Sequence, residues 1–268
     1  MGIQGSSEEK IRDLPQEWYE RVLRLLDYIA KTQRKNVEKA AEIVADSIFK
    51  GHVCFLFGSG HAAIPVMEIF PRYGSMVGFV PIVDLPLVSF LRLVGDMGYP
   101  QFDYIENSPE YGRRIVENYE IHGDDCAIIF SQSGTTPVTL EVALQVKSRG
   151  SKVIGVTSIA HSLRAKPRHP SGLKLFEVAD VVIDTGVPPG DVSIEVFSGG
   201  KPIKVGPLST IAFVFVANFV LLSTYERLLR AGYNPIILPV RGFDPDADIL
   251  MRKALSKYRD LYSRHISK

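Results

Sequence analysis

The sequence has few of the features that mark secreted, membrane or nucleic-acid-binding proteins. Its 268 residues include only two cysteines, Cys54 and Cys126, both beside apolar runs, which excludes a disulfide framework and a cysteine zinc site. The 31 basic and 30 acidic side chains leave a net charge of +1, so no excess charge favours nucleic acid or anionic lipid as a partner. Glycine and proline occur at ordinary frequencies, which argues against disorder and fibrous repeats.

Long hydrophobic segments are also scarce. The first residues are polar and lack the apolar core of a secretory signal. The longest apolar run, residues 211–222, is shorter than the roughly 20 residues of a membrane span and is interrupted by Asn218. We therefore expect a buried helix over this run, and a cytoplasmic protein without a membrane-spanning segment.

Short apolar runs alternate with helical patterns along the chain. Residues 15–50 have apolar positions at helical spacing, with a break between 31 and 36. Five later runs are continuously apolar, as expected for parallel strands buried on both faces. They are residues 53–57, 77–83, 126–130, 153–156 and 181–183. Helical patterns cover residues 62–73, 86–93, 136–149, 173–179, about 207–230 and 249–262.

This alternation predicts an α/β fold. We expect a three-layer, doubly wound sandwich around a five-stranded, mainly parallel sheet, which forms one domain over residues 51–268. The helical segment before it is expected to form an N-terminal arm over residues 1–50, and its wide apolar stripe must be buried against the domain or a second copy of the chain.

Three of the predicted strands end in loops rich in glycine and hydroxyl groups. The loops read F-G-S-G-H (57–61), F-S-Q-S-G-T-T-P (130–137) and V-T-S (156–158). The carboxyl ends of parallel strands meet at one edge of the sheet, where ligands bind. Hydroxyls and N–H groups at a helix N-terminus favour a phosphate dianion. A serine or threonine before a helix is often only an N-cap, but the second loop has more hydroxyls than one cap needs.

The first loop also fits a dinucleotide-binding pattern. Gly58, Gly60 and Ala63 match G-x-G-x-x-A, and Asp84 ends the next strand about 20 residues later. In such a site the hydroxyl-rich loop over residues 131–136 would have no role. An NAD-dependent dehydrogenase is therefore the less favoured interpretation.

These loops resemble those of the SIS (sugar isomerase) domain family. Its α/β domain binds phosphosugars in aldose–ketose isomerases, phosphosugar etherases and sugar-sensing regulators. The match extends from about Lys31 to Ala231, and the chain is most similar to a stand-alone branch with an N-terminal helical arm. The family tends to have a hydroxyl residue where this chain has Ala62. Further matching segments are H-S (161–162), R-H-P-S-G (168–172), D-V-V-I-D (180–184), P-P-G-D (188–191) and G-P-L-S-T (206–210).

The resemblance implies a phosphorylated sugar or amino sugar as the ligand. It also implies a homodimer or higher homo-oligomer with each site near a subunit interface. By position, Ser131, Ser133 and Thr136 would hold the phosphate, while Gln132 and Ser59 would add contacts. Ser158, in the third of the hydroxyl-rich loops, is a further candidate for the same site.

The activity favoured by this resemblance is aldose–ketose isomerisation of a phosphosugar. Proton transfer through an enediol needs a base and an acid, and no metal or other cofactor. SIS regulators usually carry a DNA-binding segment before the domain, and the first 50 or so residues contain no basic recognition helix. The alternatives are therefore a phosphosugar sensor that acts through protein partners, and a phosphosugar etherase or lyase.

Candidate acid and base residues follow the first loop or flank a basic loop. Glu68 lies seven residues after His61 and near the same helical face, and a glutamate on this helix is the base in some isomerases of this fold. Glu68 could instead pair with Arg72. His61 is expected to contact the ligand or to cap the helix. His161 and His169 bracket a basic loop that would close over the ligand, or form a solvated turn.

The remaining acidic and histidine residues give weaker signals. Asp191, after a Pro-Pro-Gly turn, could supply a carboxylate or merely form the turn. The aspartates at 244–248 lack the glycine and glutamate of a calcium loop. His52, His122 and His265 show no spacing that indicates a metal site.

Overall fold

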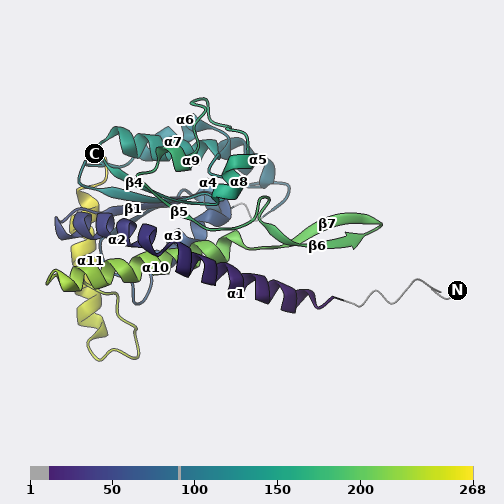
Figure 1. Cartoon of the computed structure of the whole chain (residues 1–268). Helices are drawn as coiled ribbons and strands as arrows, with labels where there is room; N and C mark the ends of the chain where they lie inside the picture. Colours follow the sequence, from purple (N-terminus) through teal and green to yellow (C-terminus); the bar gives the residue numbers. More distant parts are fainter. Residues whose placement is uncertain (1–11, 90–91, 268) are drawn as a thin grey trace.

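The computed structural model describes residues 12–89 and 92–267 (Figure 1). The five predicted strands are present and form one parallel sheet in the order β2-β1-β3-β4-β5. Their bounds are β1 Cys54–Gly58, β2 Phe79–Ile82, β3 Cys126–Phe130, β4 Lys152–Thr157 and β5 Val181–Asp184. The strand order reverses between β1 and β3, and such a switch point is where open α/β sheets bind ligands.

The central strands are buried on both faces, as their continuous apolar runs predict. Every residue of β1 and β3 is buried, with Phe55, Phe57 and Phe130 among the largest enclosed side chains. In the strand register, Gly58 pairs with Phe130, which pairs with Val156. The three loops that follow these residues therefore leave the sheet at the same level.

Helices cover both faces of the sheet and complete the predicted three-layer sandwich (Figure 1). One face carries α6 (Pro109–Glu117), α7 (Pro137–Ser148) and α9 (Leu175–Val178). The other carries α2 (Arg34–Phe49), α3 (Ile64–Ile69) and α10 (Ser209–Arg230). The short helices α4 (Leu85–Val88), α5 (Tyr99–Glu106) and α8 (Ile159–Arg164), with the 3-10 turn η1 (Gly60–Ala63), lie towards the carboxyl edge.

Helix α10 contains the long apolar run. Of the helices in residues 12–89 and 92–267, it alone has the length and apolarity of a membrane span, which core helices also have. Its buried side chains, including Ala212, Phe213 and Val216, belong to the main hydrophobic core, and the helix packs against α2 and α3. We therefore describe α10 as a core helix, as the sequence predicts.

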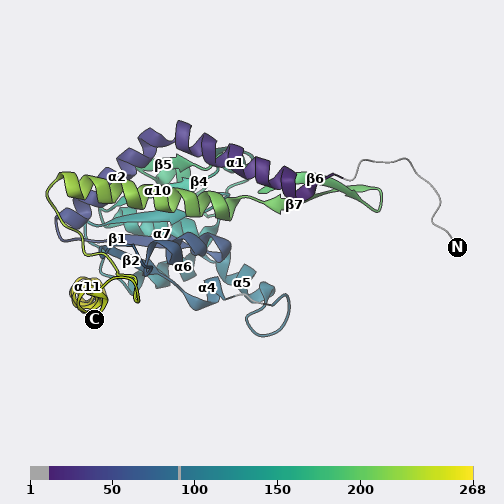
Figure 2. The same cartoon turned by 90° about the horizontal axis from the view of Figure 1, so that it is seen from below.

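The residues before the sheet form two helices that meet at Gln33. The first, α1 (Leu14–Thr32), begins at an Asp13 cap, whose carboxylate accepts a hydrogen bond from the Gln16 amide at 3.0 Å. The second is α2, whose buried residues pack against the sheet. The first half of α1 projects from the body of the protein (Figures 1 and 2).

A two-stranded antiparallel sheet projects beside α1 and was not predicted (Figure 2). It consists of β6 (Val192–Ser198) and β7 (Lys201–Pro207). The Trp18 indole donates a hydrogen bond to the Pro207 carbonyl at 3.2 Å, which joins the hairpin to α1. The final helix α11 (Ala247–Ser263) packs at the opposite end of the molecule, with Ala254 and Leu261 in the core.

Candidate functional site

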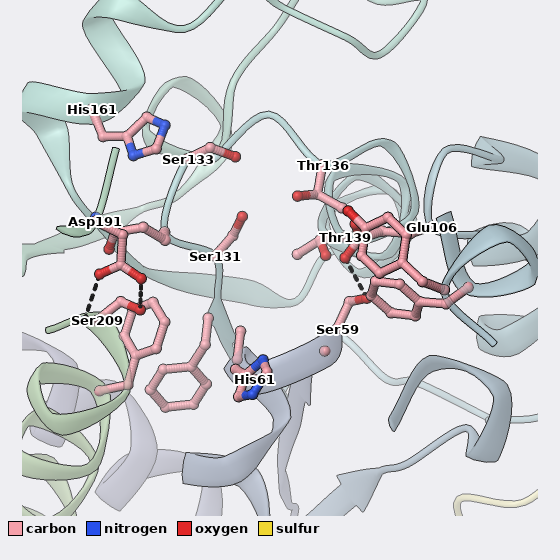
Figure 3. Close-up of a pocket in the computed structure, with 17 residues that line it drawn as sticks. Ser59, His61, Glu106, Ser131, Ser133, Thr136, Thr139, His161, Asp191 and Ser209 are labelled. Atoms are coloured by element: carbon pink, nitrogen blue, oxygen red, sulfur yellow. Dashed lines mark hydrogen bonds between the residues drawn. The ribbon is translucent and has the colours of Figure 1, made fainter. Parts of the chain in front are cut away.

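A cavity of about 360 Å³ opens at the carboxyl edge of the sheet, beside the reversal of strand order. Its walls come from the loops after β1 and β3, from α5, α7 and α8, and from the start of α10 (Figure 3). The structure brings seven of the ten residues predicted for the site to its lining. They are Ser59, His61, Ser131, Gln132, Ser133, Thr136 and His161.

The loop after β1 is as tight as its glycines suggest. A Cβ atom at Gly58 would lie 2.0 Å from the Ala62 carbonyl oxygen, so no other residue fits without moving the backbone. Gly60 has a φ of +61°, which favours glycine. This turn brings Ser59 and His61 to the cavity, where the Ser59 hydroxyl donates a hydrogen bond to Glu106 at 2.8 Å.

The loop after β3 turns its carbonyl groups away from the cavity. The Gln132 carbonyl accepts a hydrogen bond from the Ser158 amide at 3.2 Å, and the Ser133 carbonyl accepts one from the Ser162 hydroxyl at 2.7 Å. Neither Ser158 nor Ser162 lines the cavity. Gly134, with a φ of +64°, permits this reversal of the chain. Hydroxyl groups and the start of α7 are therefore left to form the cavity wall (Figure 3).

The N-terminus of α7 lacks a side-chain cap. Thr136 occupies the N-cap position, but its side chain makes no capping hydrogen bond and lines the cavity instead. The Thr139 hydroxyl, one turn later, lines the same wall. The described lining includes no lysine or arginine. Attraction for an anion here therefore depends on the helix dipole, the hydroxyls and the backbone amides.

Unpartnered polar atoms are concentrated at this cavity. Among the described residues, five buried side-chain nitrogen or oxygen atoms have no hydrogen-bond partner. Three of them belong to lining residues: both amide atoms of Gln132 and Nδ1 of His161. Buried polar groups are nearly always hydrogen-bonded in folded proteins. Residues that border the cavity therefore account for most of the described buried polar atoms that lack a partner.

Two titratable side chains in the lining have shifted pKa values. Burial raises the pKa of Glu106 above the usual range of a glutamate, although the hydrogen bond from Ser59 and the charge of Arg168 oppose the shift. Burial lowers the pKa of His161, with the charge of Asp191 opposing it. Both shifts favour the neutral form, as expected for titratable groups that are partly removed from water.

Asp191 reaches the cavity but is fully engaged in holding α10. Its carboxylate accepts hydrogen bonds from the Leu208 amide at 3.2 Å, and from the amide and hydroxyl of Ser209 at 2.8 Å each (Figure 3). A carboxylate at a helix N-terminus is electrostatically favourable. The contacts of Asp191 are therefore those of a helix cap.

Three predicted site residues lie outside the cavity lining. Glu68 accepts hydrogen bonds from Arg72 at 3.0 Å and from Asn218 at 3.4 Å, which is the pairing considered for it above. Ser158 caps α8: its hydroxyl accepts from the His161 amide at 3.1 Å and donates to the Val187 carbonyl at 2.6 Å.

The third, His169, holds the basic loop against the body of the protein. It is buried, and its Nε2 lies 2.9 Å from Glu141 on α7. Arg168 donates a hydrogen bond to Asn107, at the end of α5. Lys174 donates to the Ser162 carbonyl at 2.6 Å. The loop therefore packs beside the cavity without supplying a lining residue.

Some lining residues carried no recognisable sequence signal. Glu106 is the last residue of α5, a helix that the apolar pattern did not predict. Thr139 could have been found, because it lies one helical turn beyond Thr136 and so shares a face with it. Further lining residues from elements outside the predicted loops are Tyr99, Phe102, Ser209 and Phe213.

A family model described as the SIS domain matches residues 17–158, more than half of the chain. This chain belongs to the SIS-domain family. Its similar relatives include two UPF0309 proteins. That of Geobacillus sp. (strain WCH70) is 30% identical over 91% of this SIS-domain chain and 96% of the relative. That of Shouchella clausii is 32% identical over 81% of this chain and 85% of the relative.

Solved structures with this SIS fold include two phosphoheptose isomerases. That of Neisseria gonorrhoeae has a TM-score of 0.50 at 14% identity and covers 80% of this chain and 98% of its own. That of Francisella tularensis has a TM-score of 0.50 at 13% identity and covers 78% of this chain and 97% of its own. At such low identity these likenesses show the fold.

Proposed function

We propose that this SIS-domain protein binds a phosphorylated sugar or amino sugar and interconverts its aldose and ketose forms. The observation that carries the proposal is the cavity wall over residues 131–136, with its hydroxyls, its turned-away carbonyls and the orphaned Gln132 amide. The volume of about 360 Å³ lies in the range of small-molecule sites, about 300–1,000 Å³. The fold shared with two phosphoheptose isomerases supports the reaction class.

In this proposal the phosphate occupies the loop after β3. Ser131, Ser133 and Thr136 donate hydroxyl hydrogen bonds, and the uncapped N-terminus of α7 adds backbone amides and the positive end of its dipole. Gln132 has both a donor and an acceptor to offer a sugar hydroxyl. The site would thus bind the phosphate dianion and the polyhydroxyl chain of the sugar in one cavity.

For the proton transfer, Glu106 is the best-placed base. It borders the cavity, and its raised pKa suits a carboxylate that must accept and then return a proton. Glu106 would take the proton from the carbon beside the carbonyl and return it to the neighbouring carbon through an enediol. His161, whose pKa is lowered by burial and whose Nδ1 has no partner, would move the proton between the two oxygens. Glu68, the base suggested by the resemblance, has no such access.

The test is a panel of hexose and amino-sugar phosphates and their unphosphorylated parents. Binding is followed by thermal shift, and products are followed by NMR. We expect phosphorylated sugars alone to stabilise the protein, and one of them to isomerise. Thr136→Val should weaken binding, while Thr224→Val, a buried hydroxyl on α10 bonded to Val220, should not.

Other results of the sugar-phosphate panel would indicate other activities. Tight binding without turnover indicates a sensor, and release of a ring substituent indicates an etherase or lyase. Protection by NADH but not by sugar phosphates would overturn the assignment of both loops. Asp84, the acidic residue of the dinucleotide pattern, accepts a hydrogen bond from the Tyr111 hydroxyl at 2.8 Å and does not line the cavity.

A homodimer is the second part of the proposal. Large apolar side chains are exposed on three helices of the same layer: Tyr19 and Leu23 on α1, Met67 on α3, and Leu222 and Leu229 on α10. Exposed apolar side chains on neighbouring helices favour association with a second copy of the chain. Light scattering coupled to size-exclusion chromatography should give twice the chain mass, and a monomer would contradict this part.

A further inference from the structure

Three of the six histidines gather at the amino edge of the sheet, opposite the cavity. His52 precedes β1 and His122 precedes β3, while His265 follows α11. The ring centroids of His122 and His265 are 5.3 Å apart, and those of His52 and His122 are 6.1 Å apart. Between them lies Asp125, which is buried.

Two of the histidines converge on one carboxylate oxygen. Asp125 Oδ1 lies 3.2 Å from His52 Nδ1 and 3.1 Å from His265 Nε2. All three ligand-type atoms lie within 4.8 Å of one another. In a tetrahedral zinc site, bonds of about 2.0–2.1 Å place neighbouring ligand atoms about 3.3–3.4 Å apart. The observed spacing therefore needs only small shifts to accept such an ion.

Hydrogen bonds from neighbouring groups hold the His265 and Asp125 side chains in place, as such bonds hold the ligands of a metal site. His265 Nδ1 lies 2.6 Å from the Leu261 carbonyl and donates to it, so Nε2 is the ring nitrogen that faces Asp125. The second carboxylate oxygen of Asp125 accepts the His122 amide at 2.7 Å. Histidine ligands of metals usually donate a hydrogen bond from the other ring nitrogen, as His265 Nδ1 does to the Leu261 carbonyl. Two acceptors that face each other require a proton or a cation between them.

We propose that His52, Asp125 and His265 bind one zinc ion or a similar divalent cation. Imidazole and carboxylate ligands suit zinc, cobalt and nickel better than magnesium or calcium. Asp125 and His265 are each 1% exposed, whereas 27% of the His52 side chain is exposed and gives access from solvent. Water or the neighbouring His122 ring supplies the fourth ligand.

The ion would fasten the C-terminal segment to the sheet. His52 and Asp125 lie at the entries of adjacent strands, and His265 lies just beyond α11. The segment is already held by Leu261 in the core and by hydrogen bonds, such as the Glu120 amide to the His265 carbonyl at 3.0 Å and the Ser267 amide to the Asn118 carbonyl at 3.0 Å. A bound ion would therefore stabilise the folded chain by mass action.

The experiment titrates Zn²⁺ into the full chain after dialysis against a chelator, with calorimetry and metal analysis of the dialysed complex. We expect one ion per chain, and with Co²⁺ the visible absorption of a tetrahedral site. His52→Gln, at the partly exposed ligand, should retain the fold and lose the ion. Asp125→Asn should do the same if it folds. The matched control His161→Gln, in the cavity, should bind zinc like the parent.

Two results would overturn the proposal. One is the absence of stoichiometric metal in the parent chain, with NMR showing a doubly protonated His265 ring. The other is zinc binding that survives in His52→Gln and is lost in His161→Gln, which would place the ion in the cavity. Binding of sugar phosphates by His52→Gln is expected to be unchanged, so this test is independent of the proposed function.

Discussion

Replacing Gln132 by leucine should raise stability and weaken ligand binding at the same time. In the ligand-free protein both amide atoms of Gln132 are buried without a partner. An unsatisfied buried polar group costs about 1–3 kcal/mol. Leucine, of similar size, removes both groups, so we expect the free energy of unfolding to rise by about 1 kcal/mol. For a chain of this size that corresponds to an increase in Tm of about 2–4 °C.

The same substitution should weaken phosphosugar binding. Gln132 is expected to make one or two hydrogen bonds to the ligand, each contributing about 0.5–1.5 kcal/mol. Their loss predicts a Kd about 2- to 140-fold higher. Thermal unfolding without ligand and isothermal titration with the best sugar phosphate of the panel measure the two effects separately.

Gln33 provides the matched control. It is also buried, but both of its amide atoms have partners: Oε1 accepts from the Asp184 amide at 3.1 Å and from Asn36 at 3.0 Å, and Nε2 donates to Thr32 at 3.1 Å. Gln33→Leu should therefore lower stability and leave Kd unchanged. The reasoning would be refuted if Gln132→Leu lost stability like Gln33→Leu while binding the ligand normally.

Three further predictions concern catalysis, the first loop and acid stability. Glu106→Gln should retain binding and lower kcat by at least about 100-fold. Because burial raises the pKa of Glu106, the rate of the parent protein should rise with pH through a value above the ordinary glutamate pKa of about 4.3. The pH profile of the variant should lack this inflection. Gly58→Ala should lower the free energy of unfolding by about 3 kcal/mol in denaturant titrations, since its Cβ would overlap the Ala62 carbonyl, whereas Gly123→Ala, with 3.8 Å of clearance, should change it by less than about 0.5 kcal/mol. Burial alone would raise the pKa of Asp180, but its hydrogen bonds with Lys147 and the Val153 amide lower the pKa overall. The contribution of Asp180 to the free energy of unfolding is therefore complete above the unfolded pKa of about 3.9, and it is lost as the pH falls through the lower pKa of the folded state. Asp180→Asn should therefore lower stability at pH 7 and flatten its decline in acid, and an unchanged acid limb would contradict this.

The sheet and the loops at its carboxyl edge could be predicted because their signals are local. Continuous apolar runs such as residues 126–130 have few alternatives to a buried parallel strand. Parallel strands then bring Ser59 and Ser131 together without any knowledge of the intervening chain, because the loops start at paired positions. The seven predicted residues that line the cavity nearly all come from these loops.

The remainder of the site depends on contacts that no local pattern encodes. Helix α6 packs closely against α7 at Gly112, where a Cβ atom would lie 2.6 Å from the Val138 carbonyl oxygen, and this contact joins two helices that are not adjacent in the sequence. Because the sequence pattern predicts neither α5 nor α6, it could not place Glu106 at the cavity. The hairpin is not among the predicted elements, although the alternation V-S-I-E-V (192–196) and the pair Gly199–Gly200 are hairpin signals. His52, Asp125 and His265 come from three distant segments, so their meeting follows only from the folded chain.

The position of the phosphate in a complex tests the account most directly. A crystal structure with a hexose phosphate should place the phosphate oxygens within hydrogen-bond distance of the hydroxyls and amides of residues 131–136, at the start of α7. A phosphate held instead by the basic loop, at Arg164 or Lys166, with residues 131–136 unengaged, would contradict the central claim.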